Sequence, residues 1–145
     1  MNRMVVEKAK KQSEPKRPIL KNCIQAFIGG GLICLFAQIL LKIFTDVLEL
    51  EKQYANTLTV TIMVFLGAFL TGLGIYDRIG QIAGAGTIIP ITGFANSMTS
   101  AALESKSEGL VLGIFTNMFK LAGSVIVVGI ISAFVMGCIR YILGI

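Results

Sequence analysis

The stretch Ile79–Leu103 constrains this chain most, because it carries no charge and yet cannot form one regular helix. Four glycines, one proline and seven polar side chains lie within it. Irregular backbone at membrane depth is tolerated only where other protein or a water-filled cavity surrounds it. Such segments mark substrate or ion paths in channels and transporters more often than passive anchors. We expect the helix break or hinge at four of its residues: Gly84, Gly86, Pro90 and Gly93.

The composition excludes an ordinary soluble domain. Hydrophobic residues make up 54% of the chain and charged residues 14%, against about a quarter charged in a typical soluble domain. The 145 residues leave no room for a separate soluble domain beside the apolar segments. We therefore predict one integral membrane unit, with a transmembrane domain over residues 22–145.

Residues 1–21 form a basic tail with seven Lys or Arg residues and two Glu residues. The tail has no aromatic interleaving, which argues against a nucleic acid as partner. We interpret it as a cytoplasmic tail that sets topology by the positive-inside rule, with attraction to anionic lipid as a side effect. Pro15 and Pro18 disfavour a continuous helix into the membrane. The 20 uncharged residues that follow exceed a signal peptide's apolar region, so we expect a retained first span and a cytoplasmic amino terminus.

The hydropathy pattern predicts an all-α integral membrane fold with about four transmembrane helices. The predicted spans are 22–41, 57–76, a broken span at 79–103, and 109–139. The last would be roughly 46 Å long as one helix, so either it tilts strongly or its first turns form a separate re-entrant or interfacial piece, with a possible break near Lys120.

The Lys and Arg residues near the span ends favour four crossings with both termini cytoplasmic. The alternative is that 79–103 re-enters the membrane, which moves the carboxyl terminus to the far side. Similar patterns, Phe69-x-x-Gly72…Tyr76 and Phe134-x-x-Gly137…Tyr141, fit two tandem helical hairpins, and chance explains them nearly as well.

Two polar stripes are the candidate substrate path. One stripe lies on the helix expected after Pro90, and the other lies in the last apolar run. Hydrogen bonding between helices is the alternative for their hydroxyls and amides. A lysine at mid-span costs about 2.5–3.5 kcal/mol, which favours a functional role, and snorkelling to the interface is its alternative. The predicted path residues are Thr92, Asn96, Thr99, Ser100, Asn117 and Lys120.

Further charges lie at the predicted span ends. Asp77 and Arg78 form a candidate interface charge pair, and a solvated turn is the plain alternative. Glu104 and Glu108, with Lys106 between them, are interpreted first as loop charges and second as a vestibule.

The sequence argues against an enzyme. It contains no histidine, so Ser-His and Cys-His pairs are impossible. The three cysteines lie too far apart for a metal-ligand spacing, and Gly84-Ala-Gly86 fits no phosphate-binding template. We predict no catalytic residue, no metal site and no cofactor.

Three runs of residues carry a family resemblance over nearly the whole chain. They are Gly74-Ile-Tyr-Asp-Arg-Ile-Gly-Gln81 with Ala83-Gly-Ala-Gly86, Pro90-Ile-Thr-Gly-Phe-Ala-Asn-Ser-Met-Thr-Ser-Ala-Ala-Leu-Glu104, and Lys106-Ser-Glu-Gly-Leu110 with Asn117-Met-Phe-Lys-Leu-Ala-Gly123. Together they resemble the stage V sporulation protein AC family of endospore-forming bacteria.

The resemblance implies a membrane subunit of the stage V sporulation A complex in the spore inner membrane, which is the forespore membrane during sporulation. The complex moves dipicolinic acid, with calcium, during sporulation and germination. The resemblance also implies AEb as a membrane partner, AD as a soluble partner, and gating by tension. A scaffold subunit without its own pore is the alternative. The resemblance assigns no pore residues. One small chain with about four crossings has too few helices to enclose a pore alone, so we expect a homo- or hetero-oligomer.

Overall fold

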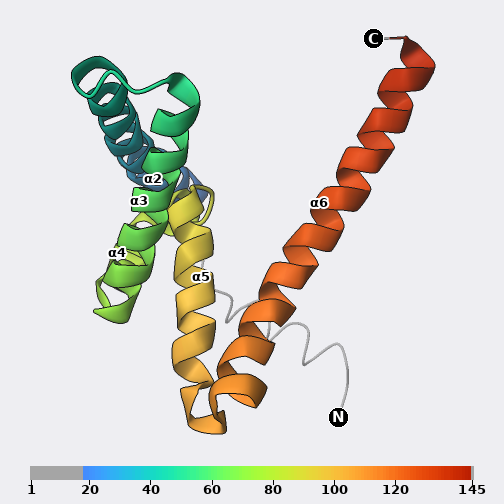
Figure 1. Ribbon diagram of the computed structural model, residues 1–145. Helices are drawn as coiled ribbons and strands as arrows, with labels where there is room; N and C mark the ends of the chain where they lie inside the picture. Colours follow the sequence, from blue (N-terminus) through green and yellow to red (C-terminus); the bar gives the residue numbers. More distant parts are fainter. Residues whose placement is uncertain (1–17, 145) are drawn as a thin grey trace, which may run out of the picture.

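The computed structural model describes residues 18–144, and helices joined by turns account for them without a β-strand (Figure 1). The predicted all-α class is confirmed. Most of the predicted basic tail, residues 1–17, lies outside the described residues.

Three segments of the described chain are long and apolar enough to cross a membrane: Ile19–Val47, Lys52–Gly72 and Leu110–Leu143. The first comprises α2 (Ile19–Lys42) and the π-helical turn η1 (Ile43–Val47), and the second is α3 (Lys52–Gly72). The third comprises the π-helical turn η4 (Leu110–Phe115) and α6 (Thr116–Leu143).

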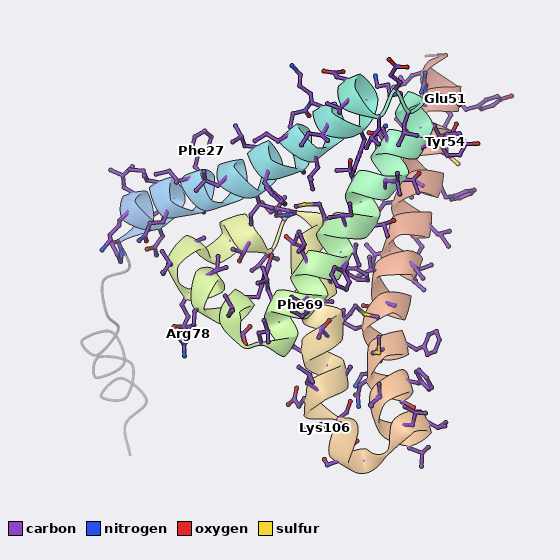
Figure 2. The ribbon with its side chains drawn as sticks, turned by 60° about the vertical axis from the view of Figure 1, so that its left-hand side comes forward. Phe27, Glu51, Tyr54, Phe69, Arg78 and Lys106 are labelled. Carbon is purple, nitrogen blue, oxygen red and sulfur yellow. The ribbon has the colours of Figure 1, made fainter. Side chains whose placement is uncertain are left out.

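The broken stretch is divided into two short helices. They are α4 (Ile75–Ala83) and α5 (Ile91–Glu104), joined through the 3-10 turn η2 (Gly84–Thr87). Neither helix reaches the roughly 20 residues needed to cross a bilayer. α4 runs antiparallel to α3 and beside it, and α5 then runs parallel to α3 (Figures 1 and 2). Residues 75–104 therefore form a hairpin of two short helices, which we call the re-entrant hairpin because neither helix is long enough to cross a bilayer.

This arrangement differs from one continuous helix over 79–103 and agrees with the alternative in which that stretch turns back, while the number of membrane crossings stays a prediction. α6 ends at the same end of the bundle as the α2–α3 loop, where Glu51 is labelled (Figures 1 and 2). Arg140 therefore lies on the side of Lys42 and Lys52. The count of Lys and Arg residues had pointed to four crossings because each apolar run was taken as one full span.

Backbone conformation sets the ends of the hairpin's helices. Gly74 adopts φ 70°, in the left-handed region that favours glycine, and α3 ends just before it. The predicted span 57–76 therefore runs too far, and Tyr76 belongs to α4. Gly84 adopts φ 50° after α4, and Pro90, with φ −65° and ψ 159°, precedes α5. A proline before the first helical residue removes a donor that the helix does not need.

Small residues let the hairpin pack against the spans. A Cβ at Gly67 of α3 would lie 2.9 Å from the Thr92 carbonyl oxygen of α5. A Cβ at Gly86 would collide with the Ala26 carbonyl oxygen of α2 and lie 2.8 Å from the Gly30 nitrogen. The hairpin is thus held by direct backbone contact with both spans.

The last apolar run bends at its start rather than near Lys120. Gly109 adopts φ 98° between the 3-10 turn η3 (Lys106–Glu108) and η4. From Thr116 the α-helix continues through Lys120 to Leu143. The irregular turn falls where Gly113 presses against Ser105, because a side chain at Gly113 would collide with the Ser105 carbonyl oxygen.

Candidate functional site

A hydrogen-bonded cluster locks the re-entrant hairpin. Tyr76 Oη lies 2.9 Å from the Thr87 carbonyl oxygen and 2.8 Å from Thr92 Oγ1. The phenol has one proton and a carbonyl can only accept, so Tyr76 donates to Thr87 and the Thr92 hydroxyl donates to Tyr76. All three residues are buried, with exposed fractions of 3–5%. The cluster therefore joins α4, η2 and α5 into one unit.

A second bond ties α5 to α3. Thr71 Oγ1 lies 2.7 Å from the Asn96 side-chain amide and 2.6 Å from the Gly67 carbonyl oxygen. The hydroxyl carries one proton, so it donates either to Asn96 Oδ1 or to the Gly67 carbonyl oxygen. The first of these bonds joins α5 to α3.

The predicted stripe on α5 therefore faces α3 and α4 at its start. Thr92 and Asn96 bond to other parts of the same chain, as in the interhelical hydrogen-bond interpretation. Thr99 and Ser100 lie further along that face and are half-buried. The two predicted stripes do not face each other.

Replacing Tyr76 by phenylalanine should destabilise the protein by about 1–3 kcal/mol, because the Thr87 carbonyl and the Thr92 hydroxyl stay buried without their partner. Thermal unfolding of the purified protein in detergent measures this. Tyr54→Phe is the matched control, since Tyr54 is 64% exposed and its change should stay within about 0.5 kcal/mol. Equal stability of the two variants would contradict the locking role of Tyr76.

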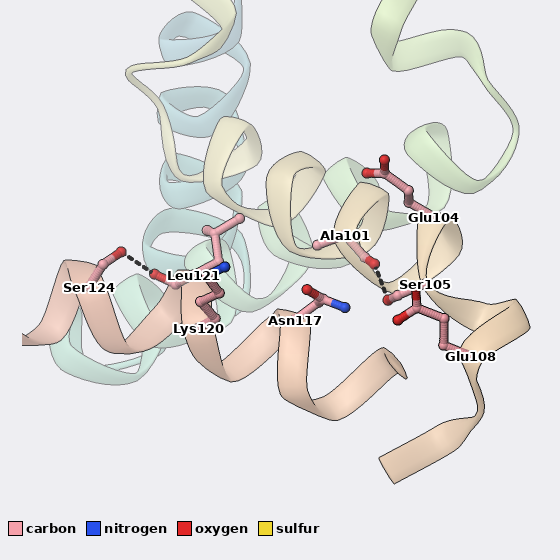
Figure 3. Close-up of a pocket in the computed structure, with 8 residues that line it drawn as sticks. All are labelled: Ala101, Glu104, Ser105, Glu108, Asn117, Lys120, Leu121 and Ser124. Carbon is pink, nitrogen blue, oxygen red and sulfur yellow. Dashed lines mark hydrogen bonds between the residues drawn. The ribbon is translucent and has the colours of Figure 1, made fainter. Parts of the chain in front are cut away.

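Asn117 and Lys120 of the second predicted stripe do meet α5, at a cleft of about 560 Å³ between α5 and the start of α6 (Figure 3). We call it the α5–α6 cleft. Its walls come from both helices and from η3. The residues that line it are Ala101, Glu104, Ser105, Glu108, Asn117, Lys120, Leu121 and Ser124.

The start of α6 has two chemically different faces. Gly113, Asn117 and Lys120 recur at helical spacing on the side of α5, and Asn117 donates to the Gly113 carbonyl at 3.1 Å. On the opposite side, Leu112 and Phe119 are 79% and 74% exposed. In a bilayer the large apolar residues suit contact with lipid, while the polar residues face the cleft.

The cleft holds charges of both signs. Glu104 and Glu108 lie on its α5 and η3 side, and Lys120 lies on α6 (Figure 3). Among the residues that the structure describes, none of the three makes an ion pair within 4 Å. All three are exposed, so their charges are available to a ligand.

The other candidate residues lie elsewhere. Asp77 and Arg78 are exposed in the first turn of α4, where a carboxylate is favourable at a helix amino terminus. Gly93, at the start of α5, sits against the backbone of η2, and a Cβ there would lie 2.5 Å from the Ile88 carbonyl oxygen. Between residues 18 and 144 no group of three or more His, Cys, Asp or Glu residues is placed to hold a metal.

Sequence reasoning missed three residues that matter here. Tyr76 was placed at the end of a span, and Thr71 was not considered. Ser105, 5% exposed in the cleft wall, was taken as part of a loop. Gly72 and Gly74 were a usable signal for Tyr76, because glycines after an apolar run favour a helix end before the tyrosine.

Comparison with known proteins agrees with the predicted resemblance. Residues 22–139 match the family model described as SpoVAC/SpoVAEB sporulation membrane protein. The chain is similar to stage V sporulation protein AC of Bacillus subtilis (strain 168), with 53% identity over 131 residues. The match covers 90% of this chain and 87% of that protein. No solved structure gives a significant match.

Proposed function

We propose, because the chain belongs to the SpoVAC/SpoVAEB family of sporulation membrane proteins, that it is a channel or transport subunit for dipicolinic acid and calcium. In this proposal it acts in the spore inner membrane during sporulation and germination. It assembles there with other stage V sporulation A proteins, AEb in the membrane and AD as a soluble partner, and opens under membrane tension.

The α5–α6 cleft is the observation that supports this proposal most directly. Its polar lining runs from Glu108, just before the last apolar segment, to Ser124 within it. On α6 the lining runs from Asn117 to Ser124, seven residues further along the helix, which corresponds to roughly 10 Å at 1.5 Å per residue. A polar face of this length along a membrane-spanning helix has a high free-energy cost of insertion unless water or a polar solute contacts it.

The α6 side of the lining suits a small dianion, whereas Glu104 and Glu108 place negative charge on the opposite side. The Asn117 amide supplies donors, and Lys120 supplies one positive charge. Conduction needs binding that is favourable enough to admit the solute and weak enough to release it. A single lysine beside neutral donors meets both requirements better than a cluster of cations.

Within this proposal, Thr92 and Asn96 of the predicted path serve to fix the hairpin, and the glycines and proline around them form its turn. The path itself then consists of Asn117 and Lys120, which line the cleft, whereas Thr99 and Ser100 do not line it.

The second candidate function is a scaffold subunit without its own pore. The bonds of Thr92 to Tyr76 and of Asn96 to Thr71 favour it, because these polar side chains hold helices of the chain together and do not face a pore. The described residues of α6 are all at least partly exposed, which leaves room for a neighbouring subunit along that helix.

Reconstitution into vesicles loaded with dipicolinate and calcium distinguishes the two functions. A conduit should release dipicolinate when the membrane is stretched by an osmotic downshift, and should retain a larger solute such as a labelled dextran. A scaffold should leave release at the level of empty vesicles, both alone and together with AEb. That second result, with the protein correctly inserted, would exclude the conduit.

A further inference from the structure

A second groove, of about 460 Å³, lies between the start of α2 and the end of α4. Three side-chain amides line it: those of Asn22 and Gln25 from α2 and that of Gln81 from α4. We call it the α2–α4 groove. It shares no lining residue with the α5–α6 cleft, so a ligand bound there is independent of the proposed function.

The three amides of this groove have no partner in the chain. None of them makes a side-chain hydrogen bond within the part of the chain that the structure describes. The threonine hydroxyl of Thr59, by contrast, bonds to the Ala55 carbonyl oxygen of its own helix. Each amide carries two N–H donors and one carbonyl acceptor, and such groups lose free energy in apolar surroundings unless something bonds to them. The groove therefore presents unpaired donors and acceptors from two helices.

The place of the groove on α2 corresponds to the level of the lipid headgroups. The first apolar span begins at Ile19, so Asn22 and Gln25 lie three and six residues into it. These separations correspond to roughly 5 and 9 Å along a helix. The polar headgroup layer occupies about 5–7 Å on each side of the hydrocarbon core. A ligand in the groove is therefore placed where a headgroup meets its acyl chains.

Positive charge and apolar surface lie beside the amides. Lys21 directly precedes Asn22 and is exposed, and the first turn of α2 contains no acidic residue. The amino-terminal end of a long helix adds to the attraction for an anion. Ile19 and Ile82 line the groove and are both exposed. This combination suits an anionic, oxygen-rich group that carries hydrocarbon chains.

We propose that the α2–α4 groove binds the headgroup of an anionic phospholipid. The amide N–H groups of Asn22, Gln25 and Gln81 donate to the phosphate oxygens, and the basic start of α2 supplies a positive potential. The amide oxygens accept from hydroxyl groups of the headgroup, which favours a glycerol headgroup over a methylated amine. The volume of the groove falls within the roughly 300–1,000 Å³ of small-molecule sites.

A headgroup held in this way joins α2 to the re-entrant hairpin, because Gln25 and Gln81 belong to different helices. Further along α2, Gly29 already packs against Ala83 at the end of α4, where an added Cβ would collide with the alanine side chain. The bound lipid extends this contact to the start of α2. It should therefore stabilise the folded chain as well as occupy the groove.

Native mass spectrometry of the full chain, with phosphatidylglycerol and phosphatidylcholine of the same acyl chains, tests the proposal. One phosphatidylglycerol molecule should bind at least about tenfold more tightly than phosphatidylcholine, as expected for hydrogen bonds to a charged group. The double variant Gln25→Met/Gln81→Met keeps the side-chain length and removes two amides, so it should lose most of this preference. Phosphatidylglycerol should also raise the midpoint of thermal unfolding of the unchanged protein more than that of the variant.

Gln38→Met/Gln53→Met is the matched control, because both glutamines are exposed and neither lines the groove. It should bind phosphatidylglycerol as the unchanged protein does. A full preference in Gln25→Met/Gln81→Met would overturn the proposal and assign the attraction to the basic tail alone. An equal loss in the two double variants would also reject a site at the groove.

Two further outcomes concern the identity of the occupant. Glycerol 3-phosphate offers a phosphate and hydroxyl groups without acyl chains, and an excess of it should leave the bound lipid in place. Displacement of the lipid at equal concentrations would make a soluble anion the ligand and overturn the proposal. A lipid-free dimer that dissociates in Gln25→Met/Gln81→Met would do the same, because a second copy of the chain would then fill the groove.

Discussion

Replacing Gly86 by valine should prevent the re-entrant hairpin from seating on α2 and should destabilise the protein by about 3 kcal/mol or more. A Cβ at this position collides with the Ala26 carbonyl oxygen and lies 2.8 Å from the Gly30 nitrogen. Both neighbours are backbone atoms within a helix, so no side-chain rotation can relieve the overlap. The midpoint of thermal unfolding in detergent, and the amount of protein in the membrane fraction, measure the effect.

Gly31→Val is the matched control for that change. Gly31 lies one residue after Gly30 on α2, is exposed, and has no atom within 4 Å of an added Cβ. It carries the same substitution on α2, the helix against which Gly86 packs, without the collision, so its unfolding midpoint should stay near that of the unchanged protein. If Gly86→Val unfolds at the same temperature as Gly31→Val, the contact between hairpin and α2 is not the one described here.

Replacing Lys120 by methionine should slow dipicolinate accumulation in developing spores by about tenfold or more while the protein stays in the membrane. Methionine keeps the length of the side chain and removes the single positive charge that the cleft presents to an anion. Dipicolinate content per spore, measured over the course of sporulation, gives the rate. Lys120→Arg keeps the charge and should retain much of the rate.

Lys106→Met removes a neighbouring positive charge that does not line the cleft. Its spores should fill at the normal rate. Normal filling in Lys120→Met spores as well would remove Lys120 from the path, and slow filling in both variants would indicate a general effect of charge at this end of the bundle.

The hairpin also explains how the hydroxyls and amides of an apolar stretch are accommodated. Threonine hydroxyls in the helices bond back to carbonyl oxygens four residues earlier, as Thr59 does to Ala55 at 2.8 Å. Within the described chain no buried side-chain nitrogen or oxygen lacks a hydrogen-bond partner. The irregular backbone is thus sheltered by α2 and α3, as the rule for membrane interiors requires.

The sequence predicted the all-helical membrane fold because hydropathy acts locally. Each apolar run must bury its own backbone hydrogen bonds within a helix, whatever its neighbours do. The same local signals predicted an interrupted backbone between Gly84 and Pro90, and the motifs of that region led to the family.

Only the tertiary structure decided how the interrupted stretch sits among the spans and which way its polar groups point. The contacts of Gly86 with α2 and of Asn96 with Thr71 join residues that are 25 or more positions apart in the chain. A helical spacing gives the face that Thr92 and Asn96 share, but it says nothing of which helix covers that face. The turn of the hairpin, the bonds of Tyr76 and the placement of Glu108 and Lys120 in one cleft depend on long-range packing, because no local energy fixes the direction in which a short helix returns.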